Sequence, residues 1–223
     1  MLCNSDKTAV LFAGCEEELI LPSAETKQAA DMVVCADGGI EFCFRAGMKP
    51  NLVVGDFDSA VPSLVERARL EGARIVEFPQ EKDETDLDIA LKMTYRAGIN
   101  RCMVYGALGG RIDHEMTNIL LLRRYACMGM RVSLIGRSSS IEVLTHEFHC
   151  SFEGKSGCPV SLIPLSEILC GVRTKGMKFE LHGDDMVSGS SRGVSNIIVE
   201  NYAEISCVTG EAAVITSGER SCS

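Results

Sequence analysis

Short apolar runs alternate with longer stretches of helical periodicity over the first 135 residues of the chain. The apolar runs have the length of buried strands and predict strands over residues 9–12, 32–35, 52–54, 74–78, 102–105 and 131–135. Between them, apolar residues at helical spacing predict helices over residues 62–72, 86–98 and 113–129. Strands and helices in this order favour a parallel sheet whose strands are joined by crossover helices.

Beyond Ser138 the pattern changes to short alternating runs separated by Gly, Ser, Thr and Pro. These runs predict antiparallel strands over residues 160–163, 194–200, 204–207 and 212–216. We therefore expect two domains. The first is an α/β domain over residues 1–145, built in three layers around a parallel sheet, and the second is a smaller all-β sandwich over residues 146–223.

The composition is that of a folded, acidic protein. Hydrophobic residues make up 46% and charged residues 24% of the chain, an ordinary balance for a globular protein. The 22 Lys and Arg against 31 Asp and Glu leave a net charge of −9, and no run of basic residues opposes it. We therefore expect no binding to nucleic acid or to anionic membranes, and polyphosphate binding only with the help of metal ions.

Eleven cysteines are scattered through apolar stretches, in an odd number and without a CxxC pair. This usage favours reduced thiols in a cytoplasmic protein over disulfides or a zinc site. His146 and His149 fall one residue short of the HExxH spacing of zinc-binding helices. The apolar stretch 8–15 is flanked by acidic residues, unlike a signal peptide, and no stretch approaches the roughly 20 apolar residues of a membrane-spanning helix.

Four polar or glycine-rich segments follow predicted strands of the first domain. They are ADGG at residues 36–39, GDFDS at 55–59, KDETD at 82–86 and GALGGRIDH at 106–114. Because the carboxyl ends of parallel strands lie at one edge of the sheet, we expect these segments to converge there, where open α/β sheets bind ligands. This edge is the predicted functional site.

Asp56 and Asp58 are candidate metal ligands. If the strand before them continues, both carboxylates point to the same side, and two such charges need a hard cation such as Mg²⁺ to balance them. A solvated turn without an ion is the alternative. Asp37, which precedes Gly38 and Gly39, is equally compatible with a simple strand-to-helix turn.

In KDETD, Thr85 and Asp88 have the spacing of a helix capping box. The other acidic residues of this segment, together with Lys82, suggest a second part of a metal and phosphate site. Compensation of the helix dipole by acidic residues is the alternative.

The segment 106–114 combines flexible glycines with Arg111 and Asp113. Glycines such as Gly109 and Gly110 let backbone N–H groups approach phosphate, and arginine offers a planar fork to phosphate oxygens. Asp113 is alternatively the N-cap of the following helix. The segment contains neither GxxxxGK nor GxGxxG, so no P-loop or dinucleotide fingerprint is predicted.

In their order and separation, ADGG, GDFDS, KDETD and GGRIDH resemble the motifs of the thiamine pyrophosphokinase family. The resemblance continues into the second domain, where VSLIPL at residues 160–165 resembles the strand that opens the family's β domain. TKGMKF at 174–179 is similar to the family's TxGLKW segment, and VSN at 194–196 is similar to its serine and asparagine loop. The match covers residues 9–216.

The resemblance implies transfer of a pyrophosphoryl group from ATP to the hydroxyethyl oxygen of thiamine, with attack on the β-phosphorus, giving thiamine diphosphate and AMP. It implies that residues 1–145 form the catalytic domain, which binds ATP and metal, and that Asp56, Asp58 and Asp86 bind Mg²⁺. The residues implied to complete or line this site are Asp37, Gly38, Asp83 and Thr85.

By the same resemblance, Arg111 and Asp113 hold the phosphates and the metal or nucleophile side. Lys82, Gly109 and Gly110 are implied to contact the polyphosphate. Such a division of roles agrees with the chemistry of phosphoryl transfer, which depends mainly on alignment and charge neutralisation.

The resemblance further implies a homodimer with shared active sites, in which thiamine lies between the α/β domain of one subunit and the β domain of the other. Residues 146–223 then bind thiamine and form the dimer, with Ser195 and Asn196 helping to hold thiamine. One position departs from the family: Phe179 follows Lys178 where the family commonly has Trp, and this chain contains no Trp. Phenylalanine keeps the aromatic face but loses the indole donor.

Two other functions remain open at this point. LVVGDFDS is an apolar strand followed by DxD, as in phosphatases of the haloacid-dehalogenase type. However, Ala60 stands where that class usually has Thr or Val, and a later GDGxND-like acid pair is missing. The other alternative is a module that binds nucleotide or thiamine without turnover.

Overall fold

The structure, a computed structural model, describes residues 6–17 and 19–218. It contains two compact units, one comprising residues up to 118 together with 134–136, the other residues 119–133 and those from 137 onward. The division passes through helix α5 (Ile112–Cys127) and strand β6 (Arg131–Ile135). The sequence-based boundary at residue 145 stays a prediction.

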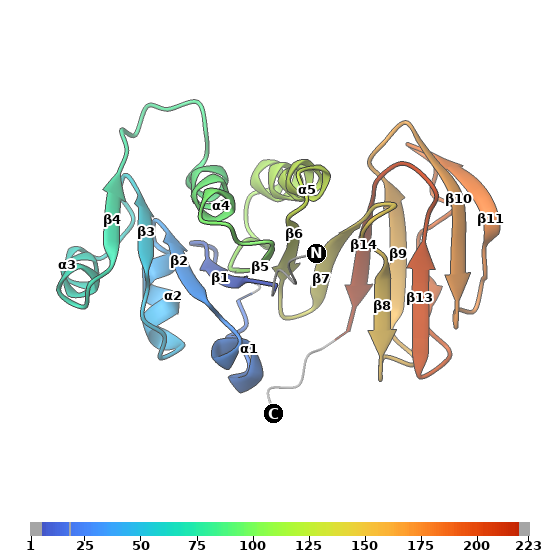
Figure 1. Ribbon diagram of the computed structural model, residues 1–223, viewed down its shortest axis with the longest axis horizontal. Coiled ribbons are helices and arrows are strands. Elements are labelled where there is room, and N and C mark those ends of the chain that lie inside the picture. Colours follow the sequence, from blue (N-terminus) through green and yellow to red (C-terminus); the bar gives the residue numbers. More distant parts are fainter. Residues whose placement is uncertain (1–5, 18, 219–223) are drawn as a thin grey trace, which may run out of the picture. The chain divides into compact units, whose positions relative to one another are not determined.

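The first unit is built on a parallel sheet (Figure 1). Strand β1 (Thr8–Phe12) pairs in parallel with β5 (Arg101–Tyr105) on one side and β2 (Met32–Ala36) on the other. Strands β3 (Leu52–Gly55) and β4 (Arg74–Glu77) continue the sheet in parallel beyond β2. The residues of β3 are all buried, as expected for a parallel strand covered on both faces.

Helices cover both faces of this sheet, which confirms the predicted three layers (Figure 1). Helices α2 (Gly39–Arg45) and α3 (Pro62–Leu70) share one hydrophobic core with β1 and β2. Helix α4 (Asp86–Arg96) packs on β2 and β3 from the other face, with Leu87, Leu91 and Thr94 buried. A short helix, α1 (Ala24–Gln28), precedes β2.

Glycine at position 39 lets the start of α2 approach the sheet closely. A Cβ added to Gly39 would lie 2.1 Å from the backbone oxygen of Phe12, a distance that no side chain tolerates. The absence of a side chain therefore places the start of α2 directly on β1. The sequence pattern did not predict α2, because this seven-residue helix has no side-chain N-cap and is apolar over most of its length.

The second unit is an antiparallel sandwich, as predicted. One of its sheets has the order β12 (Asn196–Ile197), β9 (Pro159–Pro164), β14 (Ala212–Ser217) and β7 (Ser139–Leu144). The other has the order β11 (His182–Val187), β10 (Ile168–Lys175), β13 (Tyr202–Ser206) and β8 (Cys150–Glu153). Buried residues from both sheets, such as Leu162, Val172 and Ile205, form one hydrophobic core.

The predicted strand over residues 194–200 is wrong in extent, since only Asn196–Ile197 is a strand. Ser195 has a φ of 64°, in the left-handed region that interrupts a strand. A Cβ on Gly193 would lie 2.1 Å from the backbone oxygen of Leu162, so the chain here runs closely over β9. Within the described residues, no helix is long and apolar enough to cross a membrane.

Candidate active site

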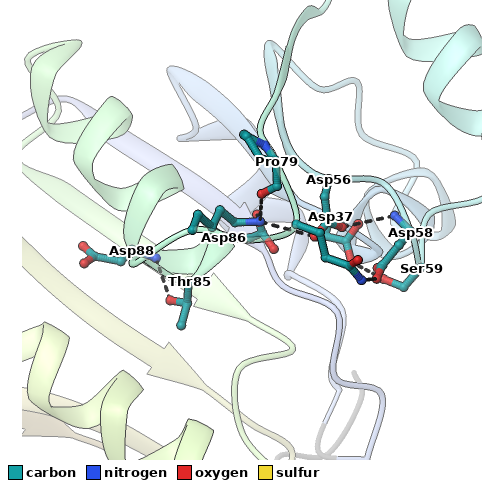
Figure 2. A network of polar contacts seen from close by, with 10 residues as sticks. Asp37, Asp56, Asp58, Ser59, Pro79, Thr85, Asp86 and Asp88 are labelled. Carbon is teal, nitrogen blue, oxygen red and sulfur yellow. Dashed lines mark hydrogen bonds and ion pairs between the residues drawn. The ribbon is translucent and has the colours of Figure 1, made fainter.

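Three aspartates that follow neighbouring strands come together at the carboxyl edge of the parallel sheet (Figure 2). Asp37 follows β2, and Asp56 and Asp58 follow β3. One carboxylate oxygen of each lies within 4.8 Å of the others. Figure 2 shows these side chains beside the start of α4. The predicted convergence of the ADGG and GDFDS segments is thus seen in the structure.

A tight turn, and not a continued strand, makes this cluster. Strand β3 ends at Gly55, and Phe57 and Asp37 have φ angles of 60° and 45° in the left-handed region. The N–H of Asp58 donates to Asp56 Oδ1 at 3.2 Å, which closes the turn. A Cβ on Gly55 would lie 3.0 Å from the Cα of Asp37, so glycine lets the two loops approach each other.

Two neutral residues hold the aspartates in place: Ser59, the last residue of the GDFDS segment, and Gln80, which lies outside the four segments. The hydroxyl of Ser59 donates to Asp37 Oδ2, and Gln80 Nε2 donates to Asp58 Oδ2 at 2.9 Å. The other oxygen of Asp37, Oδ1, is buried and has no hydrogen-bond partner among the described residues. A buried carboxylate oxygen without a donor is costly unless a cation binds it, so this atom is suited to ligate a metal ion.

Lys82 links Asp56 of the cluster to Asp86 at the start of α4. Its Nζ lies 3.3 Å from Asp56 Oδ2 and 3.2 Å from Asp86 Oδ1, and it donates to the backbone oxygen of Pro79 at 3.2 Å. Asp86, predicted as a metal ligand, is outside the group of three and forms an ion pair with Lys82.

These contacts move the pKa values of the three charged groups in different directions. The hydrogen bond from the N–H of Asp58 lowers the pKa of Asp56, and the Lys82 ammonium adds to this effect. Burial raises the pKa of Asp86 even though Lys82 opposes it. Desolvation disfavours the ammonium of Lys82, but its pairs with Asp86 and Asp56 outweigh this and raise the pKa of Lys82.

The residues of the KDETD segment, at the start of α4, have separate roles. Thr85 is the N-cap of α4, since the N–H of Asp88 donates to Thr85 Oγ1 at 3.2 Å, which confirms the predicted cap (Figure 2). Glu84 binds Lys92 Nζ at 2.8 Å. Asp83 is exposed, and within the described chain the structure gives its side chain no hydrogen bond or ion pair.

The glycines of the loop after β5 have the conformation expected for an anion-binding turn, with φ angles of 86° at Gly109 and 80° at Gly110. Their N–H groups already donate to carboxylates: that of Gly109 to Glu115 Oε1, and that of Gly110 to Glu17 Oε2 at 2.7 Å. Cys15 Sγ donates to the backbone oxygen of Gly109 at 3.1 Å. The backbone N–H groups that were predicted to bind phosphate are therefore present, and in this structure they donate to carboxylates of the chain itself.

Arg111 and Asp113 form a two-bond ion pair, with distances of 3.1 Å from Nε and 2.5 Å from Nη2. Both side chains are exposed. The Arg111 guanidinium, together with the N–H of His114, lowers the pKa of Asp113. Helix α5 begins at Ile112, so Asp113 lies in its first turn and the alternative role of N-cap is wrong.

A cleft of about 350 Å³ extends between the loops of the first unit. Its lining includes Asp37, Ser59, Asp86, Gly110 and Arg111, so elements of all four sequence segments border one cavity. The lining also includes His114, the last residue of the fourth segment, and Cys15 and Asn118, which lie outside the four segments.

The second unit has a cavity of its own, of about 370 Å³. Ser195 and Asn196 line this cavity together with Phe179, Glu180 and Arg192. Phe179 is 61% exposed, so an aromatic side chain is open to solvent at this pocket. The predicted binding residues of the second domain thus border one pocket.

Carboxylates clustered beside a lysine, at the ligand-binding edge of a parallel sheet, suit a polyphosphate that arrives with a metal ion. Fold and site together therefore define an enzyme of phosphate-group transfer. Residues 24–134 match the family description "Thiamin pyrophosphokinase, catalytic domain", and residues 145–210 match "Thiamin pyrophosphokinase, vitamin B1 binding domain".

Individual relatives agree with these matches. Thiamine pyrophosphokinase 1 from Oryza sativa subsp. japonica is 32% identical over 203 residues, covering 79% of this chain and 75% of the relative. Thiamine pyrophosphokinase from Bacillus subtilis is 28% identical over 213 residues, covering 95% of this chain and 99% of the relative. The chain belongs to the thiamine pyrophosphokinase family.

Solved structures support the same assignment. The crystal structure of thiamine pyrophosphokinase from Bacillus subtilis has a TM-score of 0.82 at 26% identity, covering 96% of this chain and 100% of that chain. The enzyme from Geobacillus thermodenitrificans has a TM-score of 0.79 at 28% identity, covering 97% of this chain and 100% of that chain. The predicted fold class and the predicted family are thus confirmed, and the phosphatase alternative is set aside.

Replacing Thr85 by alanine removes the oxygen that caps α4. We expect Thr85→Ala to lower the free energy of unfolding by about 1 kcal/mol, because the N–H of Asp88 loses its partner. Thr85→Ser keeps the hydroxyl and should remain near the unsubstituted protein. Urea unfolding followed by circular dichroism measures both variants, and an unchanged stability of Thr85→Ala would contradict the capping role.

Proposed function

We propose that this chain transfers a pyrophosphoryl group from ATP to thiamine, giving thiamine diphosphate and AMP. The observation that carries this proposal is the cluster of Asp37, Asp56 and Asp58 beside Lys82 in a chain that matches both the catalytic and the vitamin B1 binding domains of the family. The cluster supplies what a triphosphate needs on an acidic protein, namely a place for metal ions and a fixed ammonium group.

We propose Mg²⁺ as the metal, held by Asp56 and Asp58 with Asp37 as a further ligand. The donor set fits, because Mg²⁺ prefers carboxylate oxygens and Asp37 Oδ1 is buried without a hydrogen-bond donor among the described residues. Asp86 completes the site from α4 in this proposal, and Asp83 lies at its exposed border. When bound, Mg²⁺ offsets the negative charge of the phosphates and of the aspartates.

Lys82, Gly109, Gly110 and Arg111 are proposed to contact the polyphosphate. The N–H groups of both glycines carry carboxylate oxygens in the structure, which supports their affinity for anions. Phosphate oxygens would take the places of these carboxylates. Arg111 forms the planar two-bond contact with Asp113 that it can also form with phosphate.

In the proposed reaction, the hydroxyethyl oxygen of thiamine forms a bond to the β-phosphorus of ATP. The bond between that phosphorus and the oxygen bridging to the α-phosphorus breaks, AMP leaves with that oxygen, and the hydroxyl proton is released. Lys82 and Arg111 would hold the phosphates in line and stabilise their charge, which is the main protein contribution in such transfers. Gly38 and Thr85 border this site.

Thiamine is proposed to bind in the cavity of the second unit, beside Phe179 and the Ser195–Asn196 turn. Its two aromatic rings and its positive charge suit an exposed aromatic face next to the carboxylate of Glu180. Phenylalanine can supply the stacking surface that the family's tryptophan commonly supplies.

We further propose a cytoplasmic homodimer in which each active site is shared between subunits. On α5, Ile112, Met116 and Leu120 recur every four residues and are 69%, 60% and 55% exposed, so they form an apolar stripe on one side of the helix. A second copy of the chain would cover such a stripe. The described cysteines are all free, which supports a reducing compartment.

Incubating the purified protein with ATP, Mg²⁺ and thiamine tests the reaction directly. We expect AMP and thiamine diphosphate in equal amounts, and AMP only when thiamine is present, because the alcohol is the acceptor. Chromatography of nucleotides and thiamine esters measures both products. Phosphate release without an acceptor would favour a phosphatase, and saturable binding without products would favour a binding module.

Replacing Asp58 by asparagine tests the metal site. We expect Asp58→Asn to lower turnover by about 100-fold or more, because the site loses a carboxylate that positions the cation. Its free energy of unfolding should not fall, because the change relieves repulsion from Asp56 and Asp37.

Asp31→Asn is the matched control for this variant. Asp31 accepts a bond from the N–H of Thr8 at 2.8 Å just before β2, at the opposite edge of the sheet, and asparagine can keep that bond. Its turnover should remain unchanged. Full activity of Asp58→Asn, or its unfolding, would contradict the metal assignment.

Mixing two impaired variants tests the shared site, at a thiamine concentration far below the KM of Phe179→Ala, where each variant alone turns over little. Asp58→Asn damages the α/β domain and Phe179→Ala the β domain, so a heterodimer of both contains one site with two defects and one intact site. After unfolding and refolding together, random pairing should restore about a quarter of the unsubstituted activity. Activity no higher than that of the separate variants would show that each site lies within one subunit.

A further inference from the structure

The side-chain amide of Asn196 is fully engaged by neighbouring groups of the chain. Its Oδ1 accepts from the N–H of Phe179 at 3.0 Å and from the N–H of Ile197 at 2.9 Å. Its Nδ2 donates to the backbone oxygen of Phe179 at 2.7 Å and lies 3.8 Å from Met177 Sδ. A primary amide offers two lone pairs and two hydrogens, so Asn196 has no remaining capacity for a ligand.

Phe179 lies in a connection that pairs with the segment carrying Asn196, where Met177 forms an isolated β-bridge with Ile198. It belongs to the connection between β10 and β11, outside the hydrogen-bond ladders of both strands. Both its backbone N–H and its backbone oxygen are bound by the Asn196 amide. Next to it, the N–H of Lys178 donates to the backbone oxygen of Ile197 at 2.9 Å. The side-chain amide of Asn196 therefore makes the two hydrogen bonds to Phe179 that the backbone of a paired strand would otherwise make.

The ring of Phe179 faces the cavity without being held by a core. It is 61% exposed and lines the pocket, and the Lys178 Nζ lies 5.5 Å from its centroid. An exposed ring of this kind gains most when a flat, positively charged ligand covers it. That gain depends on the direction of the ring, because a ring that turns away from the pocket offers no stacking surface.

We propose that Asn196 is a positioning residue for thiamine: it clamps the backbone of Phe179 so that the ring presents its face to the pocket, and it acts on the substrate only through that ring. The proposal rests on the proposed function, which makes thiamine the ligand of this pocket. It assigns Asn196 a role different from direct contact with thiamine, and it makes Phe179 the group that binds.

The turn before Asn196 supports this arrangement. Ser195 has a left-handed φ of 64°, and its N–H donates to Ser161 Oγ at 3.1 Å. A non-glycine residue in this conformation is uncommon and persists only when its surroundings hold it. Here the conformation directs the next side chain, that of Asn196, onto the Phe179 backbone.

A double-mutant cycle tests the proposal. We expect Asn196→Ala to raise the KM for thiamine about tenfold, which corresponds to about 1.4 kcal/mol, while the KM for ATP stays the same. In the Phe179→Ala background the same change should have no further effect on the KM for thiamine, because the ring that Asn196 positions is missing. Independent effects that add up in the double variant would overturn the proposal.

Asn51→Ala is the matched control. The amide of Asn51 also binds a backbone N–H, that of Val33 at 2.7 Å, but in the first unit. Its loss should lower stability without changing the KM for thiamine. A rise in that KM equal to the one in Asn196→Ala would show a general effect of weakened folding and would overturn the proposal.

A spectroscopic measurement keeps the test decisive if Asn196→Ala does not fold. The chain contains no Trp, so Phe179→Trp introduces a single indole at the position of the ring, which can be excited apart from the four tyrosines. Asn196→Asp keeps the two acceptor bonds but cannot donate to the Phe179 backbone oxygen. We expect the indole anisotropy to fall in Phe179→Trp with Asn196→Asp, and thiamine to quench it more weakly than in Phe179→Trp alone.

Equal anisotropy and equal quenching in the two proteins would overturn the positioning role. A wild-type protein that forms no thiamine diphosphate but binds other ligands would instead overturn the proposed function, and this inference with it. The two failures are distinguishable, because the first leaves thiamine turnover intact.

Discussion

Repulsion among carboxylates is the constraint on which the site depends. Asp37, Asp56 and Asp58 place oxygens within 4.8 Å of one another on a chain whose net charge is already −9. At such distances, like charges raise each other's free energy unless a cation lies close by. Lys82 supplies one positive charge against Asp56 and Asp86, which leaves the cluster in excess of negative charge and therefore suited to a divalent cation.

The aspartate cluster requires unfavourable backbone conformations in the loops that carry it. Asp37 and Phe57 adopt left-handed φ angles that L-residues rarely take, and glycine at positions 39 and 55 lets backbone segments approach each other. Such conformations persist because the strands and helices beneath them are buried on both faces. The core of the α/β unit thus makes possible a charged cluster that would not form in an isolated loop.

Sequence reasoning predicted the parallel sheet and most of its strand positions because buried parallel strands are short, continuous apolar runs, as in β1 and β3. It missed β11, with the sequence HGDDMV, because that strand is polar on its exposed face and buries little. It also missed β10 as a strand, where register shifts between Leu169 and Arg173 disturb the alternation. These two segments are strands because they form hydrogen bonds with neighbouring strands, and their own sequence pattern does not predict it.

The same limit applies to the site. Motif spacing identified Asp56 and Asp58, but it could not predict that Asp37 lies closer to them than Asp86 does, because two turns decide that geometry. Nor could it predict Glu17 and Glu115 on the glycine N–H groups. Their positions depend on the path of the chain after β1 and on the first turn of α5, and no local sequence pattern encodes the meeting of these two segments.

The two cavities differ in the charge of the ligands they suit, and this difference follows from their residues. The cleft of the first unit is lined by Asp37 and Asp86, by Arg111 and by Gly109 and Gly110, and Lys82 pairs with Asp86, so it suits a metal-bound polyanion. The pocket of the second unit is lined by Phe179 and Glu180 and also by Arg192, whose guanidinium is paired with Asp184. Its aromatic and acidic residues suit a flat cation. In the proposed function, two substrates of opposite charge would each meet a surface whose charged groups suit it.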